Sequence, residues 1–123
     1  MVQLRGTKMA KVKRKVINIS VGEKTKMMLW EVAKYFKIRE SAFVEKAMND
    51  LEDETLRTDF KKFCELMGYK NIEKSGEHKP LFIQESLIYR IKKDHFEYNL
   101  KNQTIFIKYL VYYYYNKYVE TII

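Results

Sequence analysis

A short alternating run near the N-terminus constrains the fold more than any other feature of the sequence. In the run VINISV at residues 16–21, the β-branched aliphatic residues Ile17, Ile19 and Val21 alternate with the polar residues Asn18 and Ser20. Alternation with a period of two predicts a half-buried strand, and Gly22 ends it. No second strand follows within hairpin distance, and a lone strand leaves both backbone edges unpaired. We therefore expect its partner to come from elsewhere, most economically from a second copy of the chain.

Two amphipathic helices are predicted directly after this strand. Apolar residues recur every three or four positions from Glu23 to Phe36, and a second stripe runs from Ser41 to Leu51. The segment 37–40 interrupts the pattern and predicts a turn. The apolar positions are Thr25, Met28, Leu29, Val32, Ala33 and Phe36 in the first stripe, and Phe43, Val44, Ala47, Met48 and Leu51 in the second.

The positive charge is concentrated in the first half of the chain. The net charge is +8, and residues 1–51 hold 12 Lys or Arg against 5 Asp or Glu, whereas residues 52–123 hold 12 against 11. A one-sided basic balance favours polyanionic partners, because neutralising phosphates releases condensed counterions. We expect residues 1–13 to form a flexible basic arm, either a solvating tail or an arm that contacts nucleic acid.

The composition argues against several classes of protein. No stretch reaches the roughly 18 consecutive apolar residues of a membrane helix, so we expect a soluble, intracellular protein without membrane contact. The single Cys64 allows no internal disulfide, and with only His78 and His95 no zinc site or other cofactor is expected. Neither a nucleophile-and-base motif nor a phosphate-cradling Gly loop is visible, so we expect no enzymatic activity.

The order strand, helix, turn, helix resembles the ribbon-helix-helix family of bacterial, archaeal and mobile-element DNA-binding proteins. Leu29 and Ala33 match a Leu and an Ala on the inner face of that family's first helix. Ile38 and the pair Ser41-Ala42 match the aliphatic residue after the turn and the opening of the second helix. The match covers Arg14 to Leu51. Lys37 departs from it, because the family commonly has Gly in the turn, and a left-handed residue with a Cβ costs about 1–2 kcal/mol.

The resemblance implies a mainly α fold that forms an intertwined homodimer. Two strands would pair antiparallel across a two-fold axis, with four helices packed beneath them. A ribbon-helix-helix domain of residues 14–52 is too short to bury an adequate core alone, so folding and dimerisation would be one event. The predicted dimer core consists of Ile17, Ile19, Val21, Leu29, Val32, Ala33, Ile38, Val44 and Ala47.

The resemblance also implies an interface with double-stranded DNA. The outward side chains of the ribbon would enter the major groove, which makes Val16, Asn18 and Ser20 the candidates for base reading. Asn18 is the strongest of them, because its amide can bind adenine bidentately. An edge strand whose polar face meets only water is the alternative. The candidates for phosphate binding, at the strand and at the start of the second helix, are Lys13, Arg14, Lys15, Arg39, Glu40 and Ser41.

Residues 53–123 are predicted to form a C-terminal domain, mostly helical or α+β, that serves as a dimer or partner interface. The stripe from Leu56 to Met67 predicts a helix, and residues 71–80 are loop-like in composition. Residues 95–108 are compatible with a hairpin or a helix. The tyrosines of residues 105–122 suggest a surface buried against another domain, a subunit or a protein partner.

The charge distribution and the resemblance together imply a sequence-specific transcriptional regulator of the repressor type, working as a homodimer, with higher oligomers on DNA left open. The resemblance also implies the cytoplasm of a prokaryote, or of the host cell if the gene is viral or plasmid-borne. A plasmid or virus partition protein, a relaxosome accessory protein or an antitoxin would use the same DNA-binding head. A basic membrane-surface or scaffold protein is an alternative of a different class.

Overall fold

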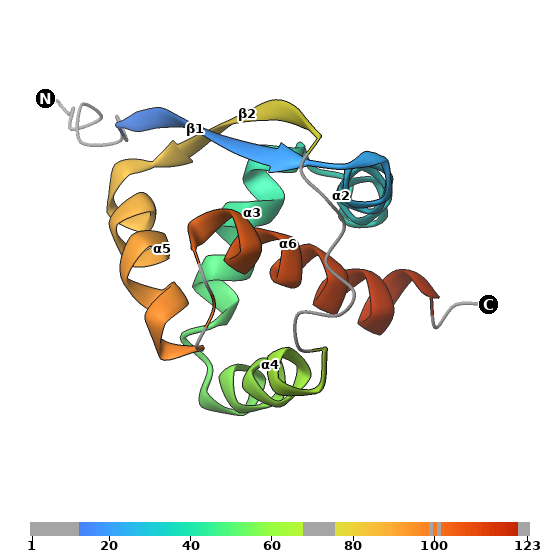
Figure 1. The fold of residues 1–123 in the computed structure, drawn as a ribbon, viewed down its shortest axis with the longest axis vertical. Coiled ribbons are helices and arrows are strands. Elements are labelled where there is room, and N and C mark those ends of the chain that lie inside the picture. The colour runs from blue at the N-terminus through green and yellow to red at the C-terminus, as the bar shows by residue number, and fades with distance from the viewer. Residues whose placement is uncertain (1–12, 68–75, 99, 101, 121–123) are drawn as a thin grey trace, which may run out of the picture.

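A two-stranded antiparallel ribbon covers one side of a group of packed helices (Figure 1). The structure, a computed structural model, describes residues 13–67, 76–98, 100 and 102–120. The basic arm at residues 1–12 lies outside the described residues. The elements in chain order are β1 (Arg14–Val21), α2 (Glu23–Phe36), α3 (Glu40–Asp50), α4 (Glu54–Met67), β2 (Glu77–Gln84), α5 (Glu85–Glu97), α6 (Gln103–Tyr114) and a π-helical turn, η1 (Tyr115–Val119). A mainly α fold was predicted, and the structure confirms it.

The partner of the N-terminal strand lies in the same chain. β1 pairs antiparallel with β2 along its whole length, from Arg14 opposite Gln84 to Val21 opposite Glu77. The expectation that a second copy of the chain is the most economical source of this strand is therefore wrong. No second strand follows β1 within hairpin distance in the sequence, because α2, α3 and α4 come before β2 along the chain.

Part of the predicted loop at residues 71–80 is strand, because Glu77 to Pro80 belong to β2. Pro80 is tolerated because β2 is an edge strand: the N–H groups of Phe82 and Gln84, two and four residues on, point away from β1. The missing N–H of Pro80 therefore removes no bond between the strands. At the start of β2, Gly76 passes so close to Val21 that a Cβ there would clash with the Val21 carbonyl oxygen.

The chain contains two strand-helix-helix units joined by α4. The first is β1, α2 and α3, and the second is β2, α5 and α6. Each helix pair packs within its own unit, and each unit also packs against the other, α2 on α6 and α3 on α5. The apolar positions that are buried along α3 and at its C-cap are also buried at the equivalent places in α6, where every residue from Phe106 to Tyr114 is buried. These positions are Phe43, Val44, Ala47, Met48 and Leu51 in the first unit, and Phe106, Ile107, Leu110, Val111 and Tyr114 in the second.

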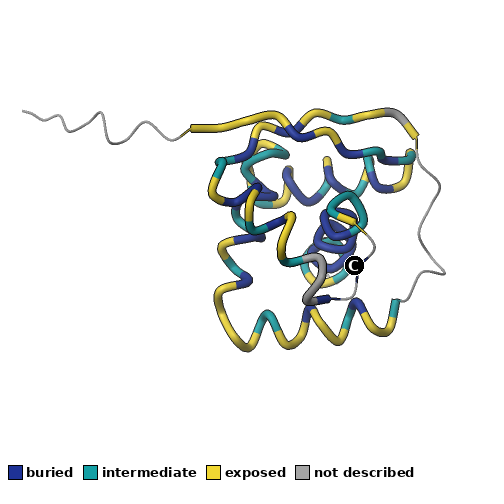
Figure 2. The backbone as a smooth tube through the Cα atoms, turned by 60° about the vertical axis from the view of Figure 1, so that its left-hand side comes forward, coloured by how far each residue is buried: buried dark blue, intermediate teal, exposed yellow. Residues whose placement is uncertain are grey.

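One hydrophobic core serves both predicted domains. Leu29 of α2, Phe43 of α3, Phe60 of α4, Ile91 of α5 and Tyr109 of α6 belong to a single cluster of buried residues. Figure 2 shows that the buried segments of the backbone gather at the centre of the molecule. The boundary predicted at residues 52–53 therefore does not divide the core. None of the helices in the described part of the chain has the length and apolar character needed to cross a bilayer.

The hairpin considered for residues 95–108 is not formed. Residues up to Glu97 complete α5, and α6 begins at Gln103. The alternation of apolar residues suggested a strand here because α6 is buried on every side. Its apolar residues therefore do not form the one-sided stripe that identifies an amphipathic helix. The tyrosines of α6 pack inside their own chain, with Tyr109, Tyr112, Tyr113 and Tyr114 all in the core.

Lys37, the first residue after α2, adopts a left-handed backbone conformation although it has a Cβ. Its φ of 58° and ψ of 42° place it in the left-handed region. The Lys37 N–H donates to the Lys34 carbonyl and the Ile38 N–H donates to the Ala33 carbonyl, both at 3.1 Å. These two bonds form the Schellman motif, which satisfies carbonyl groups at the end of α2. The turn thus forms a left-handed cap of the kind that glycine favours, with lysine in its place.

Lys37→Gly should raise the free energy of unfolding by about 0.5–1 kcal/mol. Glycine removes the strain of about 1–2 kcal/mol, part of which its greater freedom in the unfolded chain offsets. Urea denaturation followed by circular dichroism measures the change. Lys37→Ala removes the same charge but keeps the Cβ, so it should give no gain. Equal stability of the two variants would contradict the strain.

Candidate nucleic-acid interface

The outer face of the ribbon is open to solvent, since the helices lie on its other side (Figure 1). On β1 the structure places Val16, Asn18 and Ser20 on this face, with Val16 48% exposed and Asn18 exposed. Ser20 is half-buried, and its hydroxyl donates to the Gly76 carbonyl at 3.3 Å. All three candidate base readers therefore share one surface.

β2 contributes as many residues to this face as β1 does. The sequence analysis did not predict this contribution. Val16 lies opposite Phe82, Asn18 opposite Pro80 and Ser20 opposite His78. His78, Pro80 and Phe82 are exposed. The alternation of buried Leu81 and Ile83 with Phe82 was the signal in the sequence, but the half-buried Lys79 and Pro80 obscured it.

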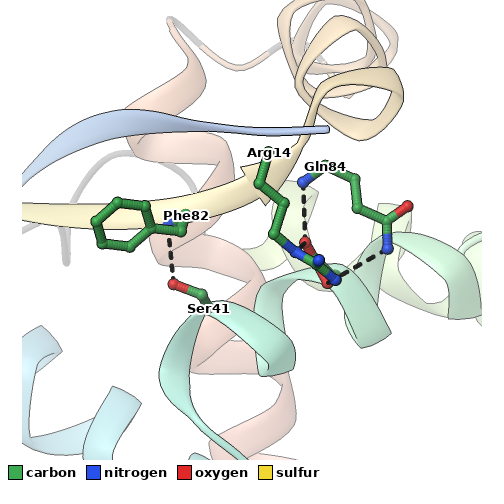
Figure 3. Close-up of polar contacts among 5 residues, drawn as sticks. Arg14, Ser41, Phe82 and Gln84 are labelled. Carbon is green, nitrogen blue, oxygen red and sulfur yellow. Dashed lines mark hydrogen bonds and ion pairs between the residues drawn. The ribbon is translucent and has the colours of Figure 1, made fainter. Parts of the chain in front are cut away.

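The N-terminal part of α3 is bonded to the free edge of β2, as Figure 3 shows. The Phe82 N–H donates to the Ser41 hydroxyl at 2.9 Å, and the Gln84 N–H donates to a Glu45 carboxylate oxygen at 2.8 Å. Ser41 therefore acts as an acceptor for the ribbon, and its backbone N–H belongs to the first turn of α3. The helix start is thereby fixed beside the ribbon.

Glu45 is a buried carboxylate that joins both strands to α3. Besides the Gln84 N–H it accepts two hydrogen bonds from the Arg14 guanidinium, at 3.1 and 3.2 Å, and a longer one from the Gln84 side chain. Hydrogen bonding to Glu45 raises the pKa of Arg14 above its already high value. The predicted role of Arg14 in phosphate binding thus competes with this ion pair.

A hollow of about 290 Å³ lies between the ribbon and the start of α3. Arg14, Arg39 and Phe82 line it, together with Ser41, Ala42 and Glu45. Arg39 is exposed and precedes the helix without a side-chain cap, and the first intrahelical bond is the one from the Phe43 N–H to the Arg39 carbonyl. The N–H groups of the first turn lack intrahelical acceptors and carry the positive end of the helix dipole, which suits an anion.

The negative charge of Glu40, at the start of α3, is neutralised by an ion pair, so it repels an anion at the helix start only weakly. Its carboxylate pairs with Lys79 Nζ at 2.6 Å, and both side chains are about three-quarters buried. Lys79 comes from the inner face of β2, so the pair also ties α3 to the ribbon. Among the other basic candidates, Lys13 is exposed, and Lys15 pairs with Glu85 at 2.9 Å while remaining mostly exposed.

The residues predicted to form a dimer core pack inside the single chain. Ile17, Ile19 and Val21 face the helices, and Ile38 is partly buried against the same core. The remaining members, all buried, are Leu29, Val32, Ala33, Val44 and Ala47.

The thiol, the carboxylates and the larger hollow in other parts of the described chain are less suited to form a catalytic, metal or anion site. Burial raises the pKa of the Cys64 thiol to about 12, so at neutral pH it is a protonated core residue. No group of three or more His, Cys, Asp or Glu side chains that could hold a metal occurs in the residues that the structure covers. A larger hollow of about 600 Å³ beside α4 is lined by Asp53, Glu54 and Asp59 as well as lysines.

The chain matches no protein-family model, no curated protein sequence and no solved structure.

Glu45→Ala should lower the free energy of unfolding by about 2–3 kcal/mol. It removes charge-assisted hydrogen bonds and leaves the Gln84 N–H without its acceptor at a partly buried site. Glu52→Ala is the matched control, because Glu52 also pairs with an arginine, Arg90, but is 69% exposed and should cost less than about 1 kcal/mol. Chemical denaturation of both variants measures the difference. Similar losses in the two would contradict the role of Glu45.

Proposed function

We propose that this protein is a sequence-specific DNA-binding regulator that lays its β1–β2 ribbon in the major groove of double-stranded DNA. One observation carries the proposal: a two-stranded ribbon has a free outer face, and a positively charged helix start is fixed at its edge. The major groove is wide enough to admit a two-stranded ribbon. This is the ribbon-helix-helix mode of binding, here with both strands from one chain.

The outer face has the chemical groups that base reading needs. The Asn18 amide can bind adenine, and exposed His78 can hydrogen-bond to base edges. Val16 and Phe82 form an exposed apolar cross-strand pair, 48% and 56% exposed, that can contact thymine methyl groups. A strand face made only to meet water gives no reason for such a pair, so this alternative is the weaker one.

Backbone contacts would come from the start of α3 and from the basic residues around the ribbon. Arg39, Ser41 and Ala42, at the start of α3, line the hollow at the ribbon's edge. The positive charge of residues 1–51 favours association with DNA and makes binding salt-dependent. Such contacts fix the position of the ribbon, whereas the outward side chains select the sequence. A regulator of this kind would act by occupying its site and excluding the transcription machinery.

Selection of bound duplexes from random DNA, followed by fluorescence anisotropy with the selected and a scrambled duplex, tests this proposal. Asn18→Ala should lower the discrimination between the two duplexes by about 1–3 kcal/mol, with the salt dependence nearly unchanged. Arg39→Gln should weaken binding to both duplexes alike and reduce the slope of log K against log salt by about 1.

Two exposed residues away from the ribbon serve as controls. Asn49→Ala, at the far end of α3, matches the first change, and Lys61→Gln, on α4, matches the second. Neither should alter discrimination or slope. A protein that binds vesicles of anionic lipid but shows no preference among duplexes would overturn the proposal in favour of a membrane-surface role.

A further inference from the structure

The two halves of the ribbon's outer face are not equivalent, although the two units are built alike. Aligning the units on their buried strand residues, Ile19 with Leu81 and Val21 with Ile83, makes three outward positions correspond. The corresponding pairs are Val16 with His78, Asn18 with Pro80, and Ser20 with Phe82. No pair is chemically alike. In a ribbon of two identical chains, each of these corresponding pairs would consist of two identical residues.

Because of the strand register, these differences make the two ends of the ribbon's outer face chemically unlike. Asn18 and Pro80 lie opposite each other at the centre, where the approximate two-fold axis of the two units would pass. One end carries the apolar pair of Val16 and Phe82, and the other carries the polar pair of Ser20 and His78. Each end combines one residue from each unit, so the difference between the ends arises only when the chain is folded.

The starts of the two corresponding helices differ as well. α3 begins after Arg39, whose side chain forms no cap, whereas α6 begins after Asn102, whose side-chain oxygen accepts the Ile105 N–H at 3.0 Å. One start thus offers a cation and an uncapped first turn, and the other a neutral, capped turn.

We propose that a single chain binds a non-palindromic duplex site, with a half rich in thymine methyl groups against Val16 and Phe82 and a half read by hydrogen bonds against Ser20 and His78. This inference rests on the proposed function, since it describes the DNA that the same ribbon would select. A homodimeric ribbon requires a site with the two-fold symmetry of the protein. One chain that supplies both strands has no such requirement, and its unlike ends favour unlike half-sites.

The mass of the complex and the symmetry of the selected site test this inference directly. We expect a motif without an inverted repeat, and native mass spectrometry should find one 14.9 kDa chain on each duplex. An inverted repeat occupied by two chains would overturn the inference while leaving the proposed function standing. A lack of preference among duplexes, or no binding to any duplex, would overturn both.

Variants at the two ends of the ribbon provide a second, independent test. Repeating the selection with Phe82→Ala should relax preference by roughly tenfold at positions on one side of the motif only. Val16→Ala should affect the same side, and His78→Ala should affect the other. Phe82→Leu keeps an apolar contact should Phe82→Ala reduce folding, and Tyr89→Ala, an exposed aromatic residue on α5, is the control. Symmetric loss on both sides of the motif with Val16→Ala, Phe82→Ala or His78→Ala would contradict the assignment of the ends.

Discussion

The pairing of β1 with β2 is the interaction on which the rest of the structure depends. A strand with the alternation of residues 16–21 can bury its odd-numbered face only if its backbone is paired, because unpaired N–H and carbonyl groups at the edge of a core are costly. The partner lies beyond residues 22–76, so pairing the two strands closes a long loop, and the packing of α2, α3 and α4 offsets the entropic cost of that closure. Non-local pairing of this kind is slow and depends on the packing around it. The ribbon and the core are therefore one cooperative unit.

The free edge of the ribbon is as important as the paired one. β2 exposes N–H groups on the side away from β1, and an open edge invites pairing with other chains. Ser41 and Glu45 accept two of these N–H groups, and Pro80 has none to offer. The same bonds place the start of α3 beside the ribbon. Protection of the strand edge and formation of the candidate phosphate site are thus consequences of one arrangement.

The sequence predicted local structure well where the periodicity was undisturbed, and poorly where one residue had to satisfy a distant partner. β1, α2 and α3 were predicted because their buried faces follow a period of two or of three to four residues. β2 was missed because Lys79 occupies an inward position, which makes sense only once Glu40 of α3 is seen to pair with it. For the interface, the alternation indicated the outward residues of β1, whereas the contribution of β2 and the burial of Glu45 depended on tertiary pairing.

The tyrosines of α6 explain why the second unit could be mistaken for a separate interface domain. Tyr113 and Tyr114 bury their rings in the core while their hydroxyl groups donate to Asp59 and Asp50 at 2.7 and 2.6 Å. Burial is the main cause that raises the pKa of both hydroxyls, which therefore stay protonated as donors. Tyrosine suits a helix that is central to the molecule but reaches polar groups at its rim. A composition that suggests an exposed aromatic surface is thus equally typical of a helix packed on all sides. The exposed residues that this unit adds to the proposed interface are those on the outer face of its strand, His78, Pro80 and Phe82.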